Sequence, residues 1–118
     1  MAVFTAVTLS GSTNGKAIAV IATSSPGTTI HTVSSATTQV FEDVFIDALS
    51  QATTDRILTL EVGGTATTFR SEHIIPAQAG PVRVMAGLRF LSATTLVIRA
   101  FSTATGGLVV GGAVNRGS

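Results

Sequence analysis

Residues 56–65 read Arg-Ile-Leu-Thr-Leu-Glu-Val-Gly-Gly-Thr, and their side chains alternate in character along the chain. One face of an extended backbone here carries Leu58, Leu60 and Val62. The opposite face carries Ile57, Thr59 and Glu61. This period of two predicts a half-buried β-strand. The glycine pair 63–64 that follows predicts a turn, because glycine adopts backbone conformations that other residues avoid.

Similar short runs lie on both sides of this strand, separated by Gly, Ser, Thr or Pro. They span residues 3–9, 16–22, 28–33, 67–75, 82–85, 94–101 and 108–114. Residues 16–22 are almost wholly apolar, which predicts burial on both faces, and residues 87–93 are predicted to form a connection. Asn14-Gly15 is the strongest hairpin signal in the chain. Gly111 and Gly112 lie inside the last run and predict a bulge or a close approach of another backbone.

Residues 40–49 fit two patterns. Their apolar residues fall on a helical stripe, with Thr37 or Thr38 available as a cap, but they also alternate as a strand would. We favour the strand because the segment is rich in Val, Phe and Ile and every neighbouring segment resembles a strand.

Eight or nine strands at a spacing of about ten residues are typical of an antiparallel sandwich or a jelly roll. The chain has 118 residues, which is the size of one domain. We therefore predict an all-β fold, a single-domain antiparallel, jelly-roll-like β-sandwich over residues 1–118. Residues 1–14 are predicted to form either an N-terminal arm or the first strand.

Charge and composition exclude several classes of function. The net charge of +1 is too small for a protein that neutralises nucleic-acid phosphates. The absence of cysteine rules out disulfides and thiol chemistry. The longest early apolar run, residues 17–22, is too short to cross a bilayer or to serve as a signal segment. These features predict a soluble protein made in a cytoplasm, with no nucleic-acid or membrane partner.

The sequence contains no recognisable catalytic or metal-binding pattern. His31 and His73 each stand alone in a strand-like run, and Glu72 points away from His73, so we predict surface or interface histidines. The only acidic cluster is Glu42, Asp43 and Asp47. We predict that these carboxylates are solubilising charges or partners for arginine across a subunit boundary. No glycine pair precedes the Lys-Ser or Lys-Thr of a phosphate loop. We predict no enzyme activity and no cofactor or metal.

Five short motifs, taken in order, resemble a family of small all-β virion proteins of tailed bacteriophages. They are residues 22–32 (Ala-Thr-Ser-Ser-Pro-Gly-Thr-Thr-Ile-His-Thr), 63–65 (Gly-Gly-Thr), 74–80 (Ile-Ile-Pro-Ala-Gln-Ala-Gly), 99–101 (Arg-Ala-Phe) and 112–116 (Gly-Ala-Val-Asn-Arg). The resemblance covers most of the chain from about residue 15 onward, and it lies in the order of the motifs.

The resemblance implies a capsid decoration or cement protein, a homotrimer that binds the major capsid protein on the outside of the expanded head. Its location would be the virion surface, after synthesis in the cytoplasm of the bacterial host. An uncharged arm over residues 1–9 would order on the capsid by strand addition. We predict intermolecular contacts at Val3, Phe4, Arg70, Arg83, Arg89 and Arg116; the arginines are chosen because each lies on or near a strand end or connection.

The sequence is also compatible with two functions other than decoration. The chain is also compatible with another virion structural protein, such as a subunit of the neck, the tail or a head fibre. A carbohydrate-binding module is more remote, because the chain has no Trp or Tyr to stack on sugar rings. Phe41, Phe69 and Phe90 would have to supply that platform.

Overall fold

The computed structural model describes residues 4–33, 41–63, 67–78, 80–91, 96–104 and 106–117, and in these ranges it consists of nine strands without a helix. The strands are β1 (Phe4–Thr8), β2 (Ile18–Ala19), β3 (Thr28–Thr32), β4 (Phe41–Ser50), β5 (Arg56–Gly63), β6 (Thr67–Ile75), β7 (Val82–Leu91), β8 (Val97–Ser102) and β9 (Leu108–Gly117).

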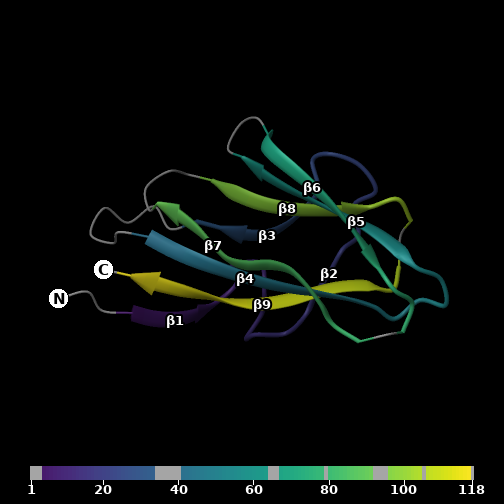
Figure 1. Cartoon of the computed structure of the whole chain (residues 1–118), viewed down its shortest axis with the longest axis horizontal. Coiled ribbons are helices and arrows are strands. Elements are labelled where there is room, and N and C mark those ends of the chain that lie inside the picture. The colour runs from purple at the N-terminus through teal and green to yellow at the C-terminus, as the bar shows by residue number, and fades with distance from the viewer. Residues whose placement is uncertain are drawn as a thin grey trace.

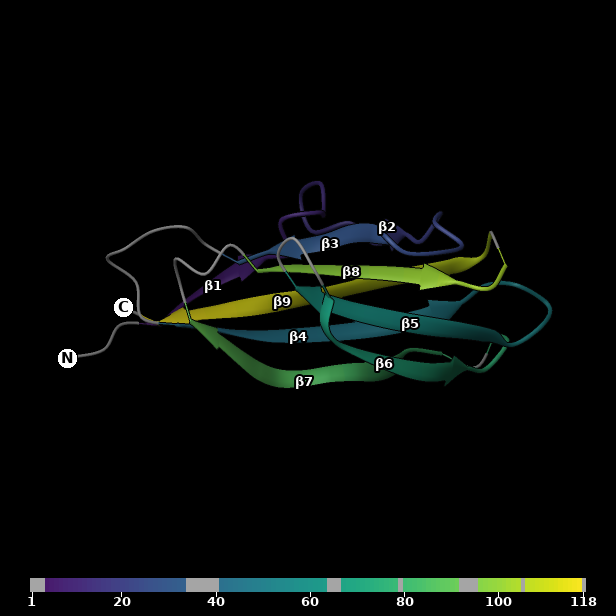
Figure 2. The same ribbon diagram turned by 90° about the horizontal axis from the view of Figure 1, so that it is seen from above.

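The strands form two antiparallel sheets that face each other (Figures 1 and 2). Sheet A has the order β1-β9-β4-β7, with β2 also paired to β9, and sheet B has the order β3-β8-β5-β6. Because β1 and β2 lie one after the other along the same edge of β9, they act as one interrupted strand. Counted in this way, the two sheets have the strand order of a jelly roll. The predicted all-β, jelly-roll-like sandwich is confirmed.

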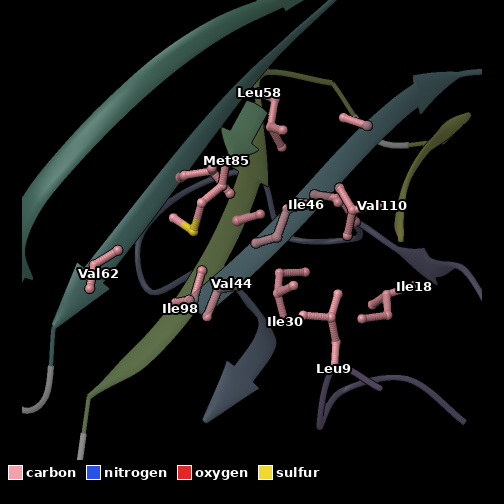
Figure 3. Close-up of a cluster of buried hydrophobic side chains, with 14 of the residues drawn as sticks. Leu9, Ile18, Ile30, Val44, Ile46, Leu58, Val62, Met85, Ile98 and Val110 are labelled. Atoms are coloured by element: carbon pink, nitrogen blue, oxygen red, sulfur yellow. The ribbon is translucent and has the colours of Figure 1, made fainter. Parts of the chain in front are cut away.

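The core lies between the sheets and consists of the side chains that each strand directs inward (Figure 3). In β4, buried and partly exposed residues alternate without exception, with Val44, Ile46 and Ala48 buried. The strand interpretation of residues 40–49 is therefore confirmed over the described part, and the helical alternative is wrong. The core also includes Leu58, Leu60 and Val62 of β5, Ile98 of β8 and Val110 of β9. Burial of such aliphatic side chains contributes about 25 cal/mol per Å² of apolar surface.

The prediction that residues 16–22 are buried on both faces is wrong. Ile18 and Ala19 pair with β9 at the edge of sheet A, and Val20 N donates to Leu108 O of the same strand at 3.0 Å. Ile18 and Val20 are buried, whereas Ile21 is 72% exposed. One face of this edge segment packs on the core and the other meets solvent, so an apolar run here does not indicate an interior strand.

Asn14 and Gly15 form the predicted turn, with φ values of 54° and 80° and a hydrogen bond from Lys16 N to Thr13 O of 3.0 Å. The predicted hairpin is absent, because β1 and β2 both pair with β9 and not with each other. Residues 9–17 instead cross to sheet B, where Gly11 N donates to Ile30 O at 2.9 Å. The turn at Asn14-Gly15 returns the chain from this crossover to the edge of sheet A, where β2 pairs with β9.

Residues 82–85 and 87–91 belong to one strand, β7, so the prediction of a connection from residue 87 is wrong. Residues 92 and 93 lie outside the described residues. The β4–β7 pairing has two register shifts: the one after Val44 leaves out Gly87, which has a φ of 76°, and the one after Ile46 leaves out Val84. Bulges of this kind interrupt the alternation that marks a strand in the sequence.

Gly112 provides the predicted close approach, since a Cβ atom there would lie 1.9 Å from Phe45 O. The alternative prediction of a bulge at this glycine pair is wrong, because β9 pairs with β4 in an unbroken register. The predicted turn after Gly63 includes residues 64–66, which lie outside the described residues.

Candidate interaction surface

The outward side chains of β4 form the centre of a broad surface, which we call the outer face of sheet A. Along β4 they are Phe41, Asp43, Phe45, Asp47 and Leu49, each only partly exposed. The sequence therefore places an aromatic ring and a carboxylate in alternation on one face of a strand. The neighbouring strands are β7 on one side and β9 on the other.

Arg89 of β7 lies directly opposite Asp43 and binds it with two hydrogen bonds, Nε to Oδ1 at 2.7 Å and Nη2 to Oδ2 at 3.0 Å. The guanidinium carbon also lies 3.8 Å from the centre of the Phe41 ring. The hydrogen bond from Arg89 lowers the pKa of Asp43 below its ordinary value, and the same bond raises the pKa of Arg89. Contact with the carboxylate and the ring fixes the orientation of this guanidinium.

Arg83 repeats this arrangement at Asp47, which lies four residues after Asp43 on the same face of β4. It lies opposite Asp47, to which its Nε donates a short hydrogen bond, and 5.5 Å from the centre of the Phe45 ring. Both members of this ion pair are more exposed than Asp43, with side chains 50% and 37% accessible for Arg83 and Asp47. The outer face therefore presents two guanidinium groups, each oriented by an aromatic ring and neutralised by a carboxylate of the same chain.

On the β9 side, the outer face carries small residues. A Cβ atom at Gly117 would lie 2.4 Å from the Phe41 ring, so a side chain at residue 117 would displace that ring. Gly111 has open space in front of it. A shallow, mostly apolar depression of about 280 Å³ lies there, lined among others by Leu49, Val109 and Pro81.

A third carboxylate–arginine–phenylalanine group lies on the outer face of sheet B. Arg70 of β6 lies opposite Glu61 of β5, donates to its Oε2 at 2.9 Å and lies 5.6 Å from the centre of the Phe101 ring. Gly27 N also donates to Glu61 Oε1 at 3.0 Å. Burial of Glu61 opposes its ionisation, but hydrogen bonds from Ser25, Gly27 and Arg70 outweigh burial and lower its pKa.

The loop and the arginine around Glu61 explain why β5 is more buried than its alternation predicts. Thr59 and Glu61, on the face expected to meet solvent, are only 4% and 3% exposed. The prediction of a half-buried strand is therefore wrong for residues 58–63, which are buried on both faces, because alternation within a strand cannot indicate which distant segments will cover its outer face.

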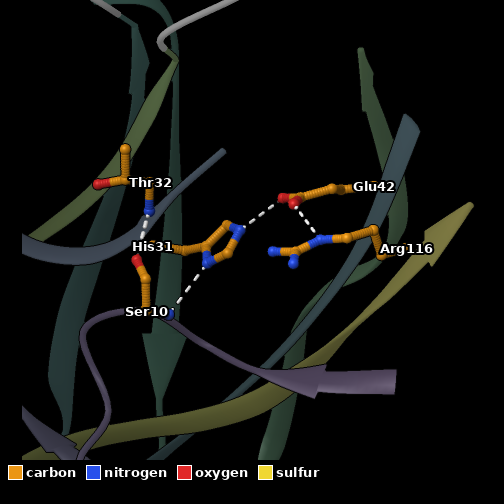
Figure 4. Close-up of polar contacts among 5 residues, drawn as sticks. All are labelled: Ser10, His31, Thr32, Glu42 and Arg116. Atoms are coloured by element: carbon orange, nitrogen blue, oxygen red, sulfur yellow. Dashed lines mark hydrogen bonds and ion pairs between the residues drawn. The ribbon is translucent and has the colours of Figure 1, made fainter. Parts of the chain in front are cut away.

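The prediction that His31 is a surface or interface histidine is wrong, because its side chain is 1% exposed inside the sandwich (Figure 4). Its Nε2 lies 2.7 Å from Oε1 of the fully buried Glu42, whose Oε2 accepts a 2.8 Å hydrogen bond from Arg116 Nε. The backbone N–H of Ser10, in the crossover, donates to His31 Nδ1 at 3.0 Å. With Nδ1 accepting, the neutral ring must carry its hydrogen on Nε2 and donate it to Glu42.

His73 is half-buried in β6, with its Nε2 3.0 Å from Ser71 Oγ. The described residues contain no group of three or more His, Cys, Asp or Glu side chains that could hold a metal ion.

The structure does not gather the six predicted contact residues on one surface. Arg83 and Arg89 lie together on the outer face of sheet A, Arg70 lies on the outer face of sheet B, and Arg116 reaches into the sandwich. Phe4 begins β1, where its backbone pairs with Gly117. Val3 lies outside the described residues. Residues 4–8 thus form a first strand that pairs with β9.

All four arginines lie directly opposite carboxylates of their own chain. Asp43 and Asp47 therefore have arginine partners within their own chain, whereas their pairing with arginine across a subunit boundary stays a prediction, as does an intermolecular role for the arginines. Sequence reasoning missed the roles of Phe41 and Phe45. The available signal was their alternation with aspartate, but the opposing arginines are found only once the register with β7 is known.

The aromatic platform suggested for a carbohydrate-binding module is not formed as expected. Phe90 is 7% exposed and belongs to the core. Phe41 is covered on one side by Arg89, and the side chain of Phe69 lies outside the described residues.

Comparison of the chain with protein-family models, with curated proteins and with solved structures gives no match in any of the three. Within the described residues there is also no helix long and apolar enough to cross a membrane.

Proposed function

We propose that this chain is a structural protein of a bacteriophage particle, and specifically a decoration protein that binds the outside of the expanded head. In this proposal the chain acts by binding alone and clamps neighbouring subunits of the major capsid protein. The resemblance to small all-β virion proteins supports this function, and a jelly-roll sandwich is an architecture found in capsid proteins.

The observation that carries the proposal is the construction of the outer face of sheet A. Three strands of ten residues and the interrupted edge strand formed by β1 and β2, spaced about 4.8 Å apart, present a face of about 600 Å². A standard protein–protein interface buries about 800 Å² on each partner, so this face is large enough to supply most of one side. Arginine and aromatic residues are also the residue types enriched at the energetic centres of interfaces.

The ion pairs on this face favour binding in a second way. Arg83 and Arg89 are already held by carboxylates and aromatic rings, so they lose little side-chain freedom when a partner arrives. Their charge is neutralised within the chain, and the partner surface therefore need not be strongly acidic. Their remaining N–H groups are suited to carbonyl oxygens of a capsid subunit.

A protein that binds only the expanded shell stabilises that shell by mass action. The stabilising free energy grows with the logarithm of the ratio between the free protein concentration and the dissociation constant. The proposal retains the homotrimer, with its three copies in a closed cyclic arrangement. A neck, tail or head-fibre subunit is the alternative, and it differs in the number of copies in each particle.

The experiment measures binding of the purified chain to expanded heads that lack it, and to unexpanded heads. We expect Arg83→Ala and Arg89→Ala each to weaken binding to expanded heads by about tenfold or more. Arg99→Ala is the matched control, because it removes an arginine from the outer face of the other sheet, where Arg99 lies opposite Glu61. Equal effects of all three substitutions, or equal binding to both kinds of head, would contradict the proposal.

A further inference from the structure

The four outer edges of the two sheets differ in how they are protected from pairing with another strand. The β3 edge is covered by the crossover, through Gly11 N to Ile30 O and Thr32 N to Ser10 Oγ. The β7 edge is distorted by two register shifts, and the edge formed by β1 and β2 is interrupted. Such distortions and covers are the usual means of preventing edge-to-edge association.

The β6 edge has none of these features in the described part of the chain. β6 extends over nine residues, pairs with β5 on one side, and has its one register shift near its beginning, at Gly63. No backbone hydrogen bond found among the described residues joins its other side to another segment. As far as the described residues show, its backbone groups on that side are open to a further strand.

Two of the exposed side chains of β6 carry opposite charges on either side of one central residue. Arg70 and Glu72 flank Ser71 and both point to the outer face of sheet B. Arg70 is bound to Glu61, whereas Glu72 has no ion-pair partner among the described residues. The sequence Arg-Ser-Glu is therefore complementary in charge to a second copy of itself in the antiparallel direction.

We propose that two copies of this chain associate edge to edge through antiparallel β6 strands, on a two-fold axis at Ser71. In this register Arg70 of each copy lies directly opposite Glu72 of the other, and sheet B continues from one copy into the next. Directly opposed residues in an antiparallel pair share a face, so opposite charges there attract.

Neighbouring registers are disfavoured by the same charges. A two-fold axis at Arg70 would place the two Arg70 side chains opposite each other, and an axis at Glu72 would do so with the two glutamates. Directly opposed like charges destabilise a strand pair. Pairing at Ser71 is the arrangement that places each charge opposite a charge of the other sign. It also places Arg70 between Glu61 of its own chain and Glu72 of the second copy.

The inference does not depend on the proposed function, since it concerns two copies of the chain in solution. It is distinct from the cyclic trimer, whose symmetry would not place two β6 strands on a two-fold axis. One edge pair is a small interface, so the association is expected to be reversible and dependent on concentration.

The absence of cysteine makes the register testable by a single substitution. In the proposed pair, the two residues at position 71 have Cα atoms about 4.5–5.5 Å apart, within the range of about 4.4–6.8 Å that a disulfide requires. We expect Ser71→Cys to form a disulfide-linked dimer under mild oxidation. His73→Cys is the matched control on the same face of β6, because its two copies would be about 14 Å apart.

A second measurement uses the cysteine-free chain and its mass in solution across a concentration series. We expect wild type to dimerise and Glu72→Arg to shift the midpoint to at least about tenfold higher concentration, since it places arginine opposite arginine. Thr53→Arg adds the same residue at an exposed loop position and should leave the midpoint unchanged. A monomeric wild type, equal cross-linking of both cysteine variants, or no effect of Glu72→Arg would overturn the proposal.

Discussion

Replacing Glu42 with glutamine changes one buried carboxylate into an amide of nearly the same shape. In the native protein, Glu42 accepts one hydrogen bond from His31 Nε2 and another from Arg116 Nε. The amide of glutamine has one oxygen and one N–H₂ group, so it can accept from one partner while its N–H₂ faces the N–H of the other. The substitution also leaves the Arg116 charge without its carboxylate.

The structure allows the size of this effect to be estimated. Removing one member of a buried ion pair costs about 3–5 kcal/mol of unfolding free energy. The Arg116 side chain is 26% exposed, so water can partly replace the lost contact. We therefore expect a loss near the lower limit, about 3 kcal/mol. At about 4 °C per kcal/mol for a domain of this size, the melting temperature should fall by about 12 °C.

The matched control is Asp47→Asn, on the opposite face of the same strand. Its partner Arg83 is half exposed, and exposed ion pairs contribute about 0–1 kcal/mol. The assay is equilibrium urea unfolding followed by far-UV circular dichroism, because the chain has no Trp or Tyr for fluorescence. Protein concentration is kept constant, since association would change the apparent stability. Equal losses in the two variants would refute the reasoning that burial sets the cost.

Two further substitutions test the packing and the electrostatics of the sandwich. Gly112→Ala should prevent folding or lower the unfolding free energy by several kcal/mol, because its Cβ atom would overlap the Phe45 carbonyl. Gly111→Ala meets open space and should be tolerated, and thermal unfolding of the two variants tests the difference. Glu61→Gln should be less stable than wild type at neutral pH, and urea unfolding should show this difference shrinking in acid. The reason is that the pKa of Glu61 lies below its ordinary value of 4.5 in the folded state, so its stabilisation is complete above that pH and is lost as pH falls through the folded value; a constant difference would contradict this.

Alternation and turn residues were sufficient to predict the fold class from the sequence. The alternating residues of β4 and β5 and the turn at Asn14-Gly15 carry local signals, and local signals decide strands and turns. Strand partners depend instead on distant segments. That β9 would pair with β1, β2 and β4 follows from the topology, and no short motif in the sequence indicates it.

The errors have the same origin. The apolar run 16–22 was predicted to be an interior strand, although one face of it is exposed, because only its place at a sheet edge decides its burial. His31 stands alone in the sequence, and its partner Glu42 lies in a different sheet. The pairing of Asp43 with Arg89 spans 46 positions and requires the β4–β7 register, which bulges make irregular.

We propose that the chain decorates a phage head, and this function is tested by the number of copies of the chain in each purified particle. Quantitative mass spectrometry can measure the ratio of this chain to the major shell protein. If the chain decorates the head, its copy number should be of the same order as that of the shell protein. A few copies in each particle would contradict decoration and favour a neck, tail or fibre subunit, and complete absence would contradict a virion role altogether.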